Sequence, residues 1–324
     1  MCWGAQAMGT QAHFEHTPAK QPPARAGEIR ELPGVSVIIA AHNEEGVIAD
    51  CLDALRTGAS SAIQVIVSAN GCTDRTVDVA AACGATVIDR AEPGKAAAIN
   101  AAEPLVTSST RIYLDADILV PTGGLDALVQ ALDSTPGAQA AVPRRRISTD
   151  GRPWPVRAYF AINERLPVFR SGLFGRGMIA VSAEGRARFE QFPTVIADDL
   201  FLDSMFADAE KTEAASVEVV VQAPRRTKDL VARLVRVRRG NAQMREAAAA
   251  GVLTAQVRPS DRWAWLRDVV ARRPQLAAAA IAYVVITLVA ARRAARADEV
   301  DWGHDASTRT TLPGAVHEVR GATT

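Results

Sequence analysis

The chain has 324 residues, of which 48% are hydrophobic and 23% are charged, a composition ordinary for a globular protein of one large domain or two small ones. Its formal net charge of +1 argues neither for nor against a nucleic-acid partner, and we expect no such partner. Four scattered cysteines lack the spacing of a zinc site or a CxxC motif, which predicts free thiols in a reducing compartment.

The two ends of the chain carry no periodic apolar pattern. Residues 1–34 are rich in Pro, Gln and Ala, without a basic start followed by an apolar core. They predict a flexible lead-in rather than a secretory signal. Residues 298–324 are polar and predict a disordered tail.

Apolar runs alternate with helical patterns between residues 35 and 120. Strands are predicted at VSVIIAA, QVIVS, ATVIDR and RIYLDAD, and helices at VIADCLDAL, VDVAAACGA and AAAINAAEPL. This order favours an α/β fold with a parallel sheet and helices on both faces. Ligands of such sheets bind beyond the carboxyl ends of the strands. The polar segments HNEE, ANGCTD and DAD follow three strands, so we expect them to converge on one crevice.

The pattern between residues 121 and 248 is less regular. We expect strands at residues 139–143, within GRGMIAVSAEG and at VEVVVQAP, and a helix at PWPVRAYFAINERLP. Asp198 and Asp199 precede an amphipathic helix. A basic segment, residues 225–245, has a helical apolar stripe that leaves most of its arginines on a solvated face.

A C-terminal helical segment is predicted at residues 262–297. Its residues 276–291 are uncharged and flanked by Arg272–Arg273 and Arg292–Arg293. A helix of this length is about 24 Å long, shorter than a hydrocarbon core of about 30 Å, although arginines that snorkel lengthen its reach. A membrane helix over 275–291, an interfacial helix and a soluble or oligomer-forming helix all remain open.

Two carboxylates end the fourth predicted strand, Asp115 and Asp117 in RIYLDADILV. Carboxylates in an apolar setting cost several kcal/mol unless they are paired or bind a metal. If the strand turns after Leu114, both reach one divalent ion. Mg²⁺ and Mn²⁺ take few carboxylates and complete their shell with substrate phosphates. The alternative is an N-cap with a surface acid.

Three classes of enzyme lack their motifs here. A nicotinamide enzyme needs GxGxxG after the first strand, where this chain has AAHNEEG. A sugar nucleotidyltransferase needs a glycine-rich loop with arginine at the same place. An aspartyl phosphohydrolase carries DxD on its first strand rather than its fourth.

The order of four motifs resembles the family 2 glycosyltransferases, which have a GT-A fold. VSVIIAAHNEEGVIADCLDAL is similar to their opening, ANGCTDRT to their DDGSTDxT motif, GKAAAIN to the following Gly-Lys stretch, and DAD to the metal motif. The resemblance covers about residues 35–240. It departs from the family at Ala69 and Asn70, which replace the usual acids, and in RVRRGN, which has arginines but lacks the Gln and Trp of QxxRW.

The resemblance implies a role for each matching residue. Asp117 would be the direct ligand of Mg²⁺ or Mn²⁺, and Asp115 would contact the ribose or the metal shell. Asp198 and Asp199 match the acidic pair that supplies the general base, and Asp199 is the stronger candidate. Donor binding would fall to Ala41, His42, Asn43, Glu44, Ala69, Asn70, Lys95, Asp115, Arg238 and Arg239. GLFGRGMIAVS would form the acceptor-side loop and strand.

We therefore expect a GT-A domain over residues 35–248, with a nucleotide-sugar half (35–120) and an acceptor half (121–248). It would move a sugar with inversion from a nucleotide-diphosphate sugar to a hydroxyl acceptor. The apolar C-terminal segment suggests a lipid-linked or cell-envelope saccharide, and a cytoplasmic catalytic domain anchored to the membrane. The alternatives are a nucleotidyltransferase-like enzyme of the same fold and a catalytically silent binding or scaffold protein.

Overall fold

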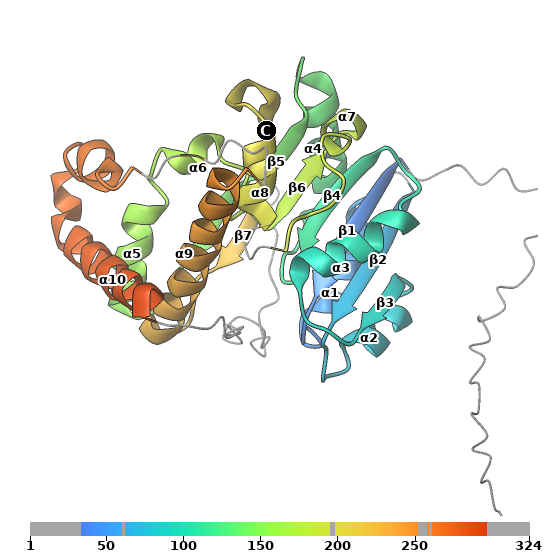
Figure 1. The fold of residues 1–324 in the computed structure, drawn as a ribbon, viewed down its shortest axis with the longest axis horizontal. Coiled ribbons are helices and arrows are strands. Elements are labelled where there is room, and N and C mark those ends of the chain that lie inside the picture. Colours follow the sequence, from blue (N-terminus) through green and yellow to red (C-terminus); the bar gives the residue numbers. More distant parts are fainter. Residues whose placement is uncertain (1–33, 60–61, 195–197, 252–257, 259–260, 297–324) are drawn as a thin grey trace, which may run out of the picture. The chain divides into compact units, whose positions relative to one another are not determined.

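The computed structural model describes residues 34–59, 62–194, 198–251, 258 and 261–296 (Figure 1). Its strands are β1 Val35–Ala41, β2 Ile63–Asn70, β3 Thr86–Arg90, β4 Thr110–Asp115, β5 Ala140–Ser148, β6 Met178–Val181 and β7 Lys211–Gln222. Its α-helices are α1 Ile48–Gly58, α2 Thr76–Ala82, α3 Lys95–Ala102, α4 Gly124–Ser134, α5 Trp154–Asn163, α6 Val168–Ser171, α7 Ala183–Arg186, α8 Asp198–Met205, α9 Thr227–Ala249 and α10 Ala277–Arg296. Short 3₁₀ turns (η1 Glu103–Leu105, η2 Asp208–Glu210, η4 Pro274–Leu276) and a π-helical turn (η3 Trp265–Val270) complete these ranges.

The strands of the described residues form one sheet in the order β3-β2-β1-β4-β6-β5-β7. β1 pairs in parallel with β2 and β4, and β2 pairs in parallel with β3. β6 is antiparallel to both β4 and β5, and β7 is parallel to β5. The predicted α/β fold is confirmed, because the β-branched runs that suited strands buried on both faces form the parallel half of the sheet.

Helices cover both faces of this sheet. On one face Leu52 of α1, Ala80 of α2 and Leu128 of α4 pack in a single apolar cluster. On the other face Ile99 of α3 and Phe201 of α8 belong to a second cluster. Both clusters take residues from alternate positions of the same strands, as the period of two in a strand requires. The carboxyl ends of β1, β2 and β4 are left between these layers, where the expected site lies.

A third apolar cluster joins α5, α9 and α10. Ile286 and Ala290 of α10 are buried in it with Tyr159 of α5 and Leu230 of α9. The ring of Tyr283 on α10 stacks on Tyr159 with centroids 5.1 Å apart. The C-terminal helix therefore packs on α5 and α9 along one of its sides.

Two sequence expectations differ from the structure in extent. The strand expected at 139–143 continues to Ser148, and its partner β7 begins at Lys211, six residues before VEVVVQAP. The register of β5 with β7 shifts between Pro143 and Arg144, because proline has no N–H to give to a sheet ladder. The predictions for residues 1–33 and 298–324 lie outside the described residues.

Candidate active site

The loops after β1 and β2 are tied together by hydrogen bonds. His42 Nδ1 donates to the Asn70 carbonyl at 2.5 Å, and Thr73 N donates to Asn43 Oδ1 at 2.8 Å. Glu44 N donates to Thr76 Oγ1 at 2.8 Å. Asn43 has a φ of 53°, a left-handed conformation that asparagine tolerates better than most residues. The HNEE and ANGCTD segments thus converge, as the sequence predicts.

Asn70 is the centre of this junction and is almost completely buried. Its Nδ2 donates to the Ala41 carbonyl at 2.8 Å, and its Oδ1 accepts from Gly94 N at 2.9 Å. A carboxylate has no proton to donate to Ala41 O, which gives a physical reason for asparagine where the resembling family has an acid. The side chains of Ala41 and Ala69 are fully buried beside it. Neither alanine exposes an atom in this structure, and their contact with a donor stays a prediction.

Lys95 connects three segments that are far apart in sequence. It is the first residue of α3, and its Nζ lies 2.7 Å from Asp115 Oδ1 and 2.9 Å from Asp198 Oδ2. Burial acts to lower the pKa of Lys95, but Asp115 and Asp198 outweigh it and hold the pKa well above its usual value. Lys95 is therefore a cation, and it joins the start of GKAAAIN to Asp115 of DAD and to Asp198 at the carboxyl edge of the sheet.

The DAD segment turns as the metal-site prediction requires. β4 ends at Asp115, and Ile118 N donates back to the Asp115 carbonyl at 3.2 Å. Asp115 N donates to the Gly177 carbonyl at 2.8 Å, which fixes the GRGM loop on the turn. A Cβ at Gly177, whose φ is 71°, would lie 2.4 Å from Ile118 Cγ1, so only glycine permits this approach.

The donor set fits a divalent cation only in part. The side chain of Asp117 is solvent-accessible, yet the surrounding protein and the neighbouring Asp115 carboxylate raise its pKa. An accessible carboxylate whose pKa is raised by burial and by a second carboxylate beside it suits a hard cation with oxygen ligands. Among the described residues no group of three or more Asp, Glu, His or Cys side chains surrounds one point. The residues therefore fit an ion whose remaining ligands come from a substrate.

Asp199 lies beside this cluster at the start of α8. Its Oδ2 accepts from Gly175 N at 3.0 Å, and its Oδ1 accepts from Leu200 N at 2.8 Å. Burial, followed by the negative charge of Asp198, raises the pKa of Asp199 from 3.8 to about 6. A carboxylate with such a pKa is ionised at neutral pH and is a stronger base than an ordinary aspartate.

Arginines outside the predicted set face the acidic cluster. The positive charge of Arg233 on α9 opposes the rise in the pKa of Asp117. Arg145 of β5 donates to the Gly175 carbonyl at 3.3 Å and lies 3.7 Å from the ring centre of Phe169. Burial and the nearby cations Arg176 and Arg233 lower the pKa of Arg145 to about 10.

The predicted Arg238 and Arg239 lie elsewhere on α9. Successive residues of an α-helix are rotated by about 100° about its axis, so Arg238 and Arg239 point about 140° and 120° away from the direction of Arg233. Arg238 and Arg233 both act electrostatically on Tyr159 of α5, whose pKa is raised chiefly by burial, but only Arg233 also acts on Asp117. Arg233 was not among the predicted site residues. The apolar stripe of α9 does not show which of its arginines lies near the DAD turn, which is more than a hundred residues earlier in the sequence.

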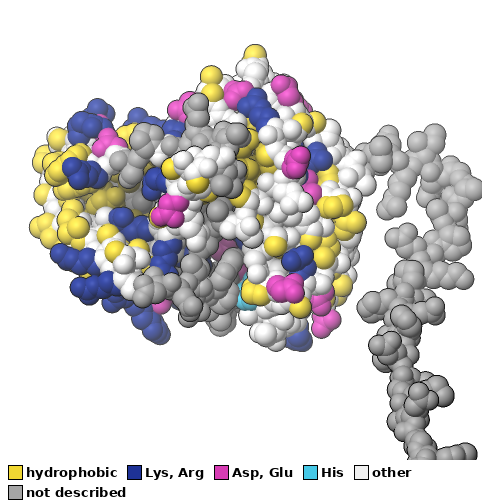
Figure 2. Space-filling model, in the orientation of Figure 1, with side chains coloured by type: hydrophobic (Ala, Val, Ile, Leu, Met, Phe, Trp, Pro, Cys, Tyr) yellow, Lys and Arg dark blue, Asp and Glu magenta, His cyan; other side chains and the backbone are white. Residues whose placement is uncertain are grey.

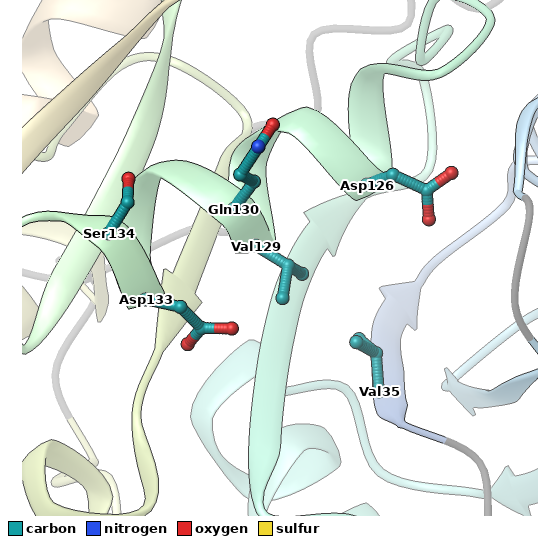
Figure 3. A pocket seen from close by; sticks show the side chains of 6 residues that line it. All are labelled: Val35, Asp126, Val129, Gln130, Asp133 and Ser134. Carbon is teal, nitrogen blue, oxygen red and sulfur yellow. The ribbon is translucent and has the colours of Figure 1, made fainter.

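A separate groove lies along α4 and is not part of this cluster (Figure 3). Val129 points across it toward Val35, the first residue of β1, with Asp126, Gln130, Asp133 and Ser134 along its side. Val35 marks the amino end of its strand, whereas the site residues follow carboxyl ends. We assign no ligand to this groove.

Comparison with known proteins gives a consistent family. Residues 36–182 match the model for "Glycosyl transferase family 2". Uncharacterized glycosyltransferases Rv0539 of Mycobacterium tuberculosis (strain ATCC 25618 / H37Rv) and Mb0553 of Mycobacterium bovis are each 34% identical over 121 residues, 37% of this chain. The match spans 52% of each relative, about half its length.

A solved structure supports the fold over most of the chain. The mannosyltransferase PcManGT from Pyrobaculum calidifontis, in complex with GDP-Man and Mn²⁺, superposes with a TM-score of 0.53. The sequence identity is 21%, and the superposition covers 86% of this chain and 80% of that chain. At this identity the likeness shows a shared architecture.

Proposed function

We propose that the chain, whose residues 36–182 match the family 2 glycosyltransferase model, transfers a sugar from a nucleoside diphosphate sugar to a hydroxyl acceptor with inversion. The observation that carries this proposal is the double ion pair of Lys95 with Asp115 and Asp198. It joins the turn after β4 to the start of α8. Asp115 of the proposed donor side and Asp198 of the proposed acceptor side thus share the ammonium group of Lys95.

Asp199 is the proposed general base. Gly175 N and Leu200 N each donate to one of its oxygens, which fixes the orientation of the carboxylate. With a pKa of about 6, it accepts the proton of the acceptor hydroxyl as the oxygen attacks the anomeric carbon. The nucleoside diphosphate leaves from the opposite face of that carbon. Asp198, which is paired with Lys95, is a positioning residue in this scheme.

Asp115 and Asp117 are the proposed holders of Mg²⁺ or Mn²⁺. When bound, such an ion supplies positive charge to the leaving diphosphate. Arg233 adds cationic charge on the same side of the cluster, as its effect on the pKa of Asp117 indicates. His42 and Asn43 border the proposed base and ribose position, where their loop is held by Asn70 and Thr73.

The acceptor is proposed to be a lipid-linked or cell-envelope saccharide. The support is α10, the C-terminal part of a helical stretch, Pro274–Arg296, that is long and apolar enough to cross a membrane. Only 17% of its most apolar 18-residue window is buried, unlike the core helix of a globular domain. An enzyme that contacts lipid through this helix has its acceptors at the membrane surface.

Donor binding by thermal shift tests the proposed function. We would screen UDP-, GDP- and dTDP-sugars with and without Mn²⁺, the ion present with GDP-Man in the P. calidifontis mannosyltransferase. One donor class should raise the melting temperature only with the metal, and Asp117→Ala should abolish the rise. Asp126→Ala on α4, outside the cluster, is the matched control and should keep it. A folded protein that responds to no donor would contradict the proposal.

A further inference from the structure

The exposed side of α10 carries large apolar side chains in register. Ile281, Val285 and Leu288 are 68%, 53% and 48% exposed. Their spacing of four and three residues places them on one face of the helix. We call these three residues the α10 stripe. Trp263 and Leu266 are also exposed. Five of the nine exposed large hydrophobic residues in the described ranges thus fall between positions 263 and 288.

The opposite side of α10 packs against the rest of the protein. Ile286 and Ala290 are buried against α5 and α9, and Tyr283 stacks on Tyr159. A helix that crosses a bilayer must give up this packing or take α9 into the hydrocarbon with it. α9 carries Arg233, Arg236, Arg238 and Arg239, whose transfer into hydrocarbon is strongly unfavourable. The packing therefore favours a helix that lies along a membrane.

Positive charge flanks the α10 stripe at both ends. Arg272 and Arg273 precede the helix, and Arg292, Arg293 and Arg296 end it, all exposed. The groove between α5, α6 and the segment after η3 adds Arg165 and Arg170 beside Arg272 and Arg273, against the two carboxylates Glu164 and Asp268. Figure 2 shows yellow and dark blue side chains gathered over the end of the molecule that α10 and its preceding segment form.

We propose that α10 docks the protein in the plane of an anionic membrane, with the α10 stripe in the acyl boundary and the arginines on lipid phosphates. An apolar face bordered by Arg and an exposed Trp is the pattern of interfacial helices. A second copy of the chain is the less suitable occupant. Two α10 stripes packed on each other would bring two sets of arginines together, and like charges repel.

This inference concerns a surface separate from the catalytic cluster, and its test does not depend on activity. The full chain would be sedimented with vesicles of phosphatidylcholine alone and of phosphatidylcholine mixed with phosphatidylglycerol. We expect binding to the mixed vesicles that weakens with salt. Ile281→Asp and Leu288→Asp should each lower the bound fraction at least about tenfold. Leu105→Asp, at an equally exposed leucine on η1, is the matched control and should bind as the wild type does.

Three results would overturn the proposal. The first is a wild type that binds neither kind of vesicle, or stripe variants that bind as well as the wild type. The second is a wild-type dimer in solution that Leu288→Asp dissociates, without vesicle binding, which would assign the α10 stripe to a second copy. The third is retention of the chain in cell membranes washed with alkaline carbonate, which releases surface-bound proteins and retains spanning ones.

Discussion

Asp198 and Asp199 are neighbours in sequence with opposite electrostatic surroundings. Asp198 lies 2.9 Å from the ammonium group of Lys95. Asp199 has two backbone N–H donors, but burial and the charge of Asp198 raise its pKa to about 6. Asp198 is therefore ion-paired with Lys95, while Asp199 carries a charge that the folded state disfavours. Different roles for the two residues follow from this contrast.

Asp199→Asn should stabilise the metal-free protein at neutral pH. The folded-state pKa of about 6 lies above the usual 3.8, so the ionised carboxylate costs folding free energy above pH 6. Asparagine keeps one acceptor oxygen, for Gly175 N, and removes the charge, although it loses the hydrogen bond from Leu200 N. We expect a gain of about 1–3 kcal/mol in the free energy of unfolding at pH 7–8, measured by urea titration.

The pH dependence of the gain in unfolding free energy tests whether the charge of Asp199 is its cause. The advantage of Asp199→Asn over the wild type should shrink as the pH falls below 6, because the folded wild-type carboxyl then takes up a proton and loses its unfavourable charge. It should vanish below about pH 4, where the unfolded carboxyl, with its usual pKa of 3.8, is protonated as well. Asp198→Asn is the paired control and should lower stability at pH 7 by roughly 1–2 kcal/mol, since it removes a partner of Lys95. A destabilised Asp199→Asn protein at pH 8 would refute this view of the pair.

At the scale of elements, the site depends on how the ends of β1 and β2 meet the start of α3. Asn70 makes this connection by donating to Ala41 O and accepting from Gly94 N. Gly94 immediately precedes Lys95, so the same side chain fixes the residue that pairs with Asp115 and Asp198. Asn70 thus positions Lys95 of the cluster, and its predicted contact with the donor stays a prediction.

Asn70→Asp should therefore loosen the junction, although it restores the acid that the resembling family carries. The carboxylate would face the Ala41 carbonyl without a proton to donate, and we expect a loss of about 1–3 kcal/mol in the free energy of unfolding. Asn100→Asp is a matched control, because Asn100 bonds the backbone of Phe192 in the same two-ended way. Both variants should be destabilised in urea titrations, but only Asn70→Asp should also weaken donor binding. An Asn70→Asp protein as stable as the wild type would contradict this role.

The sequence predicted the parallel half of the fold because its signals are local. β-Branched apolar runs and helical spacing identify β1, β2 and β4 with the helices between them, and the carboxyl-end rule brings their loops together. The parts it missed depend on contacts between distant segments. The bonds of Asn70 span 24 and 29 residues, and Arg233 faces a turn on another element. The late strand β7 was predicted too short because its first six residues, KTEAAS, have no apolar side chain larger than alanine.

At the scale of the whole molecule, α9 links the two surfaces discussed above. Arg233 on one side of this helix faces the Asp115–Asp117 turn, and Leu230 and Val231 pack with α10 on another. A membrane that holds α10 would therefore hold the catalytic cluster near the lipid surface, where a lipid-linked acceptor lies. Because α9 packs on α10 and also carries Arg233, the proposed docking surface and the proposed lipid-linked acceptor are consistent with each other.

The central claim is that one cluster separates donor binding, at Asp115 and Asp117, from proton removal, at Asp199. The most direct test measures the release of nucleoside diphosphate from the identified donor, in the presence of Mn²⁺, as a function of pH. For the wild type kcat/KM should fall below about pH 6, where Asp199 becomes protonated. Asp199→Asn should bind the donor as tightly as the wild type and lose about 10²–10⁴-fold in rate at pH 7. An Asp199→Asn enzyme that keeps its rate, or that loses donor binding as Asp117→Ala does, would contradict the account.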